Sequence, residues 1–133
     1  MQIIAQYGDM GPKWFNVSLR VLIILAKNSE LTTSKTLSEK TNTESSFIRK
    51  VLAKLVDVQL IDVKEGRYGG YSLNKPASEI NVSELYLILS KDNYLKSQEL
   101  LIFHSDIKIS TMIQSAENAF VRELEKYTIT DLL

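Results

Sequence analysis

The chain of 133 residues contains no cysteine and a single histidine, His104. The absence of cysteine excludes disulfides, thiol nucleophiles, zinc–cysteine sites and iron–sulfur clusters held by thiolates. One histidine also disfavours a His-rich metal site or a Ser–His triad, and a lone histidine is typically a surface or packing residue. No carboxylate pair stands at a catalytic spacing, so the sequence favours a protein that is not an enzyme and has no cofactor.

Long hydrophobic runs are missing as well. No uninterrupted apolar stretch reaches about 18 residues, so we expect no membrane span. The first residues, MQIIAQYGDMGPKW, lack the basic segment, apolar segment and cleavage site of a signal peptide. We therefore expect a cytoplasmic protein. Its 44% hydrophobic and 24% charged residues are typical of one domain that buries a core.

The sequence also lacks net charge, but its charges are unevenly distributed. Residues 34–75 contain eight basic and five acidic side chains, whereas residues 92–133 contain four basic and seven acidic ones. A basic segment followed by an acidic one is compatible with a local surface that binds a polyanion.

The order of predicted elements is helix, two short helices separated by a turn, hairpin, helix and long helix. The first helix, 14–28, is apolar on two faces, so it should pack against two neighbours, a partner subunit or another helix of the chain. Thr33 or Ser34 should cap the next helix, Thr41–Asn42 should form the turn, and Thr43 should cap the helix that follows. The remaining elements are strands 61–64 and 71–74, a helix over 82–91 capped by Ser83, and a long helix over about 106–127. The fold class is mainly α with a small β-hairpin.

A helix, a helix–turn–helix and a hairpin in this order predict a winged-helix domain. Small or basic side chains occupy the exposed face of its second short helix: Ser45, Ser46, Arg49, Lys50 and Lys54. An arginine can form two hydrogen bonds to a guanine in the major groove, and lysines neutralise phosphates. The alternative for the helix alone is an ordinary solvated face.

The stretch EGRYGGYSL, residues 65–73, joins the two strands. A phosphate-binding loop of a nucleotide fold would be followed by a helix, whereas here a second strand follows. A plain turn explains the glycines but not the intervening Arg67 and Tyr68. A wing tip explains both, with Gly69 allowing close approach to DNA and Arg67 entering the minor groove. Ser34, at the start of the first short helix, completes the predicted DNA-binding set.

Three segments carry a more specific resemblance: NVSLRVLIILAK, SSFIRKVLAKLVDVQLI and GRYGGYSLNKPASEINVSELY. Over residues 15–90 the chain resembles the Rrf2 family of bacterial winged-helix transcriptional regulators. The resemblance implies a dimeric regulator, usually a repressor, that binds double-stranded DNA through residues 1–80 and dimerises through residues 81–133. It also implies that the long helix crosses to a second copy. The apolar face of that helix contains Ile109, Met112, Ile113, Ala116, Ala119, Phe120, Leu124 and Tyr127.

Many members of the family carry three cysteines before the long helix that hold an iron–sulfur cluster. The corresponding segment here, KDNYLKSQELLIFHSDIK, contains His104 but no cysteine. We therefore expect a regulator without a cluster and leave open whether a small molecule or a protein is its effector. The sequence assigns no role to residues 1–13. The alternative is a winged-helix module that docks another protein, such as a metabolic enzyme. Neutralisation of the basic surface by Glu44, Asp57 and Glu65 would favour this alternative.

Overall fold

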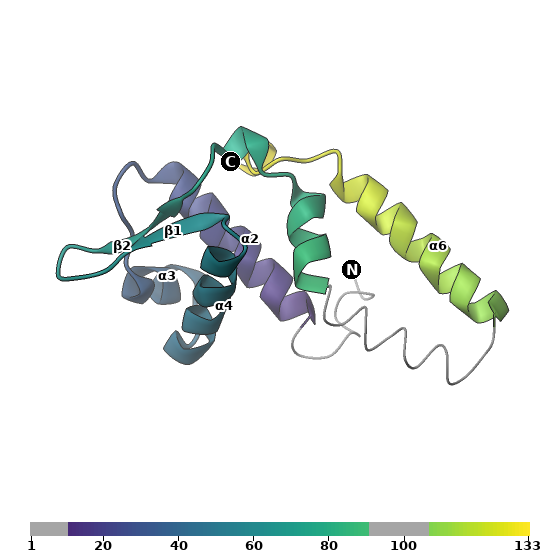
Figure 1. The fold of residues 1–133 in the computed structure, drawn as a ribbon, viewed down its shortest axis with the longest axis horizontal. Coiled ribbons are helices and arrows are strands. Elements are labelled where there is room, and N and C mark those ends of the chain that lie inside the picture. Colours follow the sequence, from purple (N-terminus) through teal and green to yellow (C-terminus); the bar gives the residue numbers. More distant parts are fainter. Residues whose placement is uncertain (1–10, 91–106) are drawn as a thin grey trace.

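The computed structural model describes residues 11–90 and 107–133, so His104 and residues 1–10 lie outside the described part. The elements follow the expected order (Figure 1). They are α2 (Gly11–Lys27), α3 (Ser34–Thr41), α4 (Ser45–Asp57), β1 (Ile61–Lys64), β2 (Gly70–Leu73), the 3-10 turn η1 (Ala77–Glu79), a helix over 82–90, α6 (Ile107–Leu124) and the 3-10 turn η2 (Thr130–Leu132). The expected fold class, mainly α with a small hairpin, is confirmed.

Helix α2 is the centre of the hydrophobic core. It packs against α3, α4 and β2, and Val21 and Leu22 in its middle are fully buried. The first of its two apolar faces meets α4, where Trp14 stands edge-on to Phe47 with ring centroids 5.4 Å apart. The second meets the helix over 82–90, where Phe15 contacts Tyr86 at 5.5 Å. The second neighbour expected for this helix is therefore another helix of the same chain.

The helix ends follow local side-chain chemistry, with two corrections. Thr33 caps α3 by accepting a hydrogen bond from the amide of Thr36, and Asn42 ends it in the left-handed conformation, both as expected. The prediction that Thr43 caps α4 is wrong, because its hydroxyl instead donates to the carbonyl of Thr41. Glu44 occupies the cap position and makes no side-chain cap bond.

The predicted cap at Ser83 is also displaced. The side chain of Asn81 accepts a hydrogen bond of 2.9 Å from the backbone amide of Ser83, which places the cap two residues earlier. Asn81 is better placed because its amide nitrogen simultaneously donates to the carbonyl of Glu125 at 2.9 Å. One side chain thus caps the helix over 82–90 and ties it to the end of α6.

The hairpin is held to the helices by a third extended segment. Strands β1 and β2 pair antiparallel, with Val63 opposite Tyr71 and Lys64 opposite Gly70. Thr32 and Tyr71 then exchange two backbone hydrogen bonds of 2.8 and 3.1 Å. A Cβ at Gly70 would lie 2.9 Å from the carbonyl oxygen of Thr32, so glycine permits this close pairing. The pairing fixes the direction of the wing relative to α3.

The chain after α6 returns to the core. The amide of Val82 donates to Tyr127, and the amide of Ile129 donates to Ile80, so the tail pairs with the segment that precedes the helix over 82–90. Ile129 is fully buried in the same core as α2 and α4. Residues on both sides of the expected division at residue 80 therefore share one hydrophobic core.

The buried face of α2 contains a serine hydroxyl without a hydrogen-bond partner among the described residues. The hydroxyl of Ser18 is fully buried and has no hydrogen-bond partner among the described residues. An unpaired buried hydroxyl costs free energy of desolvation, and alanine is the better helix former. Ser18→Ala should therefore raise the free energy of unfolding by about 1 kcal/mol, measured by urea denaturation.

The matched control for that substitution is Thr41→Val. The hydroxyl of Thr41 is also buried, but it donates to the carbonyl of Leu37 at 2.7 Å. Thr41→Val removes a satisfied hydrogen bond and should lower the free energy of unfolding by about 1 kcal/mol. Equal losses in both variants would show that the hydroxyl of Ser18 finds a partner in solution.

Candidate nucleic-acid interface

The exposed face of α4 is confirmed as small, polar and basic. Ile48, Val51, Leu52 and Leu55 are fully buried. The side chains of Ser45, Ser46, Arg49 and Lys50 are exposed and that of Lys54 is half-buried. Apolar residues recur at every third or fourth position of α4. Because an α-helix has 3.6 residues per turn, they share one face and leave the opposite face to the polar and basic residues. The helix therefore presents a projecting basic face beside a face that anchors it.

The first turn of α4 also offers backbone donors. Glu44 makes no side-chain cap bond, and its carbonyl accepts from the amides of Phe47 and Ile48. The amides of Ser45 and Ser46 have no hydrogen-bond acceptor within the described part of the chain, and they lie at the positive end of the helix dipole. Such an end attracts phosphate groups.

The tip of the hairpin carries the second basic feature. Arg67 is exposed and lies over the ring of Tyr68, with its guanidinium carbon 5.6 Å from the ring centroid. Tyr68 is itself 81% exposed, so neither side chain contributes to the core. Gly69 is required by the loop itself, because a Cβ there would overlap the backbone carbonyl of Lys64.

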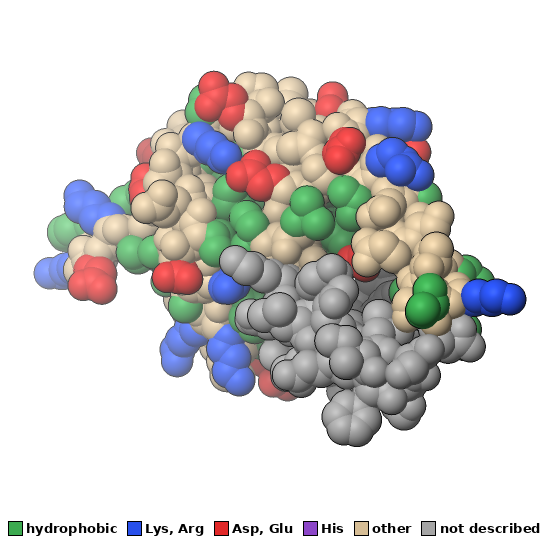
Figure 2. All heavy atoms as spheres, turned by 45° about the vertical axis from the view of Figure 1, so that its right-hand side comes forward, with side chains coloured by type: hydrophobic (Ala, Val, Ile, Leu, Met, Phe, Trp, Pro, Cys, Tyr) green, Lys and Arg blue, Asp and Glu red, His purple; other side chains and the backbone are tan. Residues whose placement is uncertain are grey.

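The hairpin and α4 project from the same end of the molecule, and α6 lies at the other end (Figure 1). In the space-filling view, basic side chains stand out at the left tip, where the hairpin lies, and along the lower left edge, where α4 lies (Figure 2). Ser34 is half-buried at the start of α3, next to the Thr33 cap. The structure therefore brings the sequence-predicted residues of α4 and the wing to one end.

The acidic residues that might neutralise this surface do not form ion pairs there. Two ion pairs are formed within residues 11–90 and 107–133, Lys75–Glu84 and Glu123–Lys126. Glu44, Asp57 and Glu65 belong to neither pair, so within the described residues they make no ion pair with the basic side chains of α4 and the wing. This is the outcome that favours a polyanion over a protein partner.

One basic residue near α4 was missed by sequence reasoning. Lys13, in the first turn of α2, holds its ammonium 4.4 Å from the centroid of the Phe47 ring. The two residues are 34 positions apart, and the helix was expected to begin only at residue 14. No local pattern could have revealed this contact.

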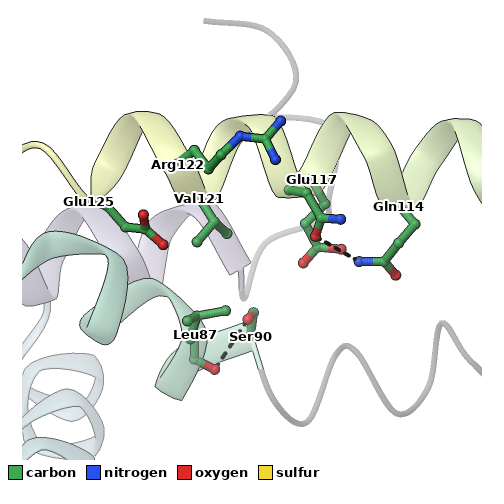
Figure 3. Close-up of a pocket in the computed structure, with 8 residues that line it drawn as sticks. Leu87, Ser90, Gln114, Glu117, Val121, Arg122 and Glu125 are labelled. Atoms are coloured by element: carbon green, nitrogen blue, oxygen red, sulfur yellow. Dashed lines mark hydrogen bonds between the residues drawn. The ribbon is translucent and has the colours of Figure 1, made fainter.

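A groove of about 510 Å³ lies between the helix over 82–90 and α6. Figure 3 shows Leu87 and Ser90 on one side, facing Val121 and polar side chains of α6. Six of the eight lining residues are polar or charged, and Leu87 and Val121 are the two apolar ones.

Comparison with known proteins identifies the family of this chain. Residues 13–133 match the Rrf2 family, described as an iron-dependent transcriptional regulator. The chain belongs to the Rrf2 family. It is 34% identical over 128 residues to the HTH-type transcriptional regulator NsrR of Oceanobacillus iheyensis, which covers 91% of this chain and 87% of that relative. The protein is thus a DNA-binding transcriptional regulator and not an enzyme.

Solved structures show the same winged-helix fold. The oxidized form of CymR from Staphylococcus aureus has a TM-score of 0.73 and 20% identity, and the match covers 94% of this chain and 95% of that one. IscR from T. potens has a TM-score of 0.71 and 16% identity, covering 90% of this chain and 82% of that one.

The sequence offers no thiolate for the iron in the family description. An iron or iron–sulfur site needs several converging thiolate, imidazole or carboxylate ligands. The sequence has no cysteine, and no group of three or more histidine, aspartate or glutamate side chains converges in the part of the chain that the structure describes. Within the same part, no helix is both long and apolar enough to cross a bilayer.

Proposed function

We propose that the protein is a homodimeric, sequence-specific repressor that places α4 in the major groove of its operator and works without an iron–sulfur cluster. The observation that carries this proposal is the unpaired basic face of α4, which projects from the same end of the molecule as the wing. The major groove of B-DNA is wide enough for one helix. Repression follows from occupying a site that polymerase or another regulator needs.

On α4, each side chain has a distinct role. Arg49 reads a guanine through two parallel hydrogen bonds, while Lys50 and Lys54 neutralise phosphates. Ser45 and Ser46, with their free backbone amides, bind a phosphate or a base edge at the helix start. Ser34, at the start of α3, contacts the phosphate backbone beside it.

In the wing, Arg67 enters the minor groove. The ring of Tyr68 supports the guanidinium from one side, which leaves its other face and its edge for the narrow, negative groove. Gly69 lets the loop turn back at this point, so that Arg67 and Tyr68 stand at the extreme tip. The wing thus extends the site beyond the bases that α4 reads.

The dimer is formed by the long helix. The first half of α6 exposes apolar side chains, with Met112 64% and Ile109 49% accessible, and Ile113 and Ala116 are exposed beside them. Farther along, Phe120 packs edge-on against Tyr86 at 4.9 Å, and Leu124 packs against the core. A second copy of α6 covers the exposed half, and its two-fold axis sets two α4 helices about 34 Å apart on one face of the DNA.

Residues 1–80 are thus proposed as the DNA-binding part and residues 81–133 as the dimerisation part. The tail at Ile129 joins them, because it is buried in the core beneath the winged helix. A change in the position of α6 would therefore be transmitted to α4 through packed side chains. This is the physical route by which an effector would act.

Substitution of Arg49 tests the role of α4. Arg49→Ala should weaken binding to a duplex selected from a random pool by about 1–3 kcal/mol and relax the preference for that duplex over a scrambled one. Lys54→Ala should weaken both duplexes alike and make the salt dependence shallower. Fluorescence anisotropy at several salt concentrations measures both effects.

The matched control is Arg20→Ala, which removes an exposed arginine from the middle of α2. It should leave both affinities unchanged. If Arg20→Ala and Arg49→Ala weakened binding equally, or if neither did, α4 would not be the reading element.

A further inference from the structure

A cation from outside the helix–turn–helix and the wing lies at the edge of α4. The ammonium of Lys13 stands 4.4 Å from the centroid of the Phe47 ring. Trp14 contacts the same ring edge-on, with an angle of 65° between the ring planes. Phe47 is therefore held between α2 and its own helix, and Lys13 occupies a defined position over it rather than extending freely into solvent.

This position is next to the lysines of α4. Lys50 follows Phe47 by three residues and Lys54 by seven, and such residues lie along one edge of a helix. Lys13, Lys50 and Lys54 therefore lie along one edge of α4. None of them takes part in the two ion pairs formed among residues 11–90 and 107–133.

Like charges along one edge of a helix repel one another in the free protein, and a bound anion relieves that repulsion. The ring face of Phe47 attracts a cation and limits the orientations of the Lys13 side chain, so less freedom is lost when the ammonium meets a ligand. Both effects favour a fixed anion beside the start of α4. When α4 lies in the major groove, the groups at its edge are the phosphates of the duplex backbone.

We propose that Lys13 binds a DNA phosphate at the flank of the half-site, and that Phe47 positions its ammonium for this contact. The inference rests on the proposed DNA-binding mode of α4 and extends it to α2. The contact is independent of sequence, because a phosphate carries no information about the base. Lys13 therefore adds affinity and fixes the angle between α2 and the duplex, without changing which operator is preferred.

The test uses the full chain and two duplexes of equal length, one selected from a random pool by the unmodified protein and one scrambled. Lys13→Met keeps the aliphatic stem over the ring and removes the charge. It should weaken both duplexes by a similar factor, roughly three- to tenfold, and lower the slope of log affinity against log salt by about one per subunit. Lys13→Arg should bind nearly as the unmodified protein does.

Two further variants separate positioning from charge. Phe47→Leu retains the lysine but removes the ring, so it should weaken both duplexes less than Lys13→Met does and leave the salt slope nearly unchanged. Lys27→Met, at the far end of α2, removes an exposed lysine and should change neither affinity nor slope. Thermal unfolding of each variant identifies any loss of DNA affinity that comes from misfolding. Misfolding would lower the active fraction of protein without changing the slope of log affinity against log salt.

The outcomes distinguish this inference from the function on which it rests. If Arg49→Ala weakens binding while Lys13→Met changes neither affinity nor salt slope, Lys13 does not contact DNA but the role of α4 stands. If Lys13→Met alters the preference between the two duplexes, the residue reads a base, and the phosphate contact is wrong. If the unmodified protein shows no salt-dependent binding to either duplex, both proposals fail.

Discussion

Replacing Met112 by glutamate should separate the proposed dimer into monomers. Met112 is 64% exposed in the single chain and lies between Ile109 and Ile113 on the uncovered half of α6. A carboxylate at the centre of an apolar helix contact loses its hydration without gaining a partner, at a cost of several kcal/mol. Because the two-fold axis of the proposed dimer would place the residue in the interface twice, we expect the dissociation constant of that dimer to rise at least about a hundredfold.

The same substitution, Met112→Glu, should also lower the affinity for the operator. When two α4 helices are linked in a dimer, binding of the first holds the second close to its half-site, so the translational and rotational entropy of association is lost only once. Separate monomers lose that entropy twice. The affinity for the selected duplex should therefore drop by roughly two orders of magnitude, while affinity for a single half-site stays the same. Sedimentation velocity measures the mass of the protein, and anisotropy with full-site and half-site duplexes measures the binding.

Ser115→Glu is the matched control for this substitution. Ser115 is also exposed on α6 but lies outside the apolar stripe, so a carboxylate there should leave the dimer intact. A Met112→Glu protein that remains dimeric and keeps its full-site affinity would show that this half of α6 is not the interface.

Ile129→Ala should be the most destabilising single substitution in the C-terminal tail. The side chain is fully buried although it lies beyond α6, four residues before Leu133. Truncating a buried isoleucine removes its transfer free energy and leaves a cavity, which together cost about 2–5 kcal/mol. In a domain of this size, a loss of 3 kcal/mol should lower the melting temperature by about 10 °C.

Leu132→Ala provides the comparison within the same turn. Leu132 is 38% exposed, so its truncation should cost less than about 1 kcal/mol. Urea denaturation of both variants gives the difference directly. Equal stability of the two variants would mean that the tail does not stay in the core in solution, and that α6 is free to take another position.

Much of the interface could be predicted from the sequence because its determinants are local. The alternation of apolar residues every three or four positions fixed the buried face of α4 and, with it, the exposure of Arg49 and Lys50. The caps at Thr33 and Asn42 depend on atoms within a few residues of each other. The same is true of the hairpin, whose strands are joined by a short loop with the expected glycines.

The predictions were wrong where a side chain that favours one local hydrogen bond or exposed position finds another partner in the folded chain. Thr43 has the side chain of a good cap, but the carbonyl of Thr41 accepts its hydroxyl proton in the tight turn between α3 and α4. Ser83 was expected to cap a helix that Asn81 caps instead, because Asn81 can also bond to Glu125, 44 positions away. The long helix was read as one apolar stripe, although Phe120 and Leu124 are covered by the chain itself.

By itself, the sequence determined the family, the order of helices and strands, and which face of α4 is basic. Only the tertiary structure decided that Ile129 belongs to the core, that Tyr86 lies between Phe15 and Phe120, and that Lys13 stands over the ring of Phe47. The physical reason is that hydrophobic attraction has no direction. An apolar pattern states that a face will be buried, but the partner is chosen by how distant segments fill space together.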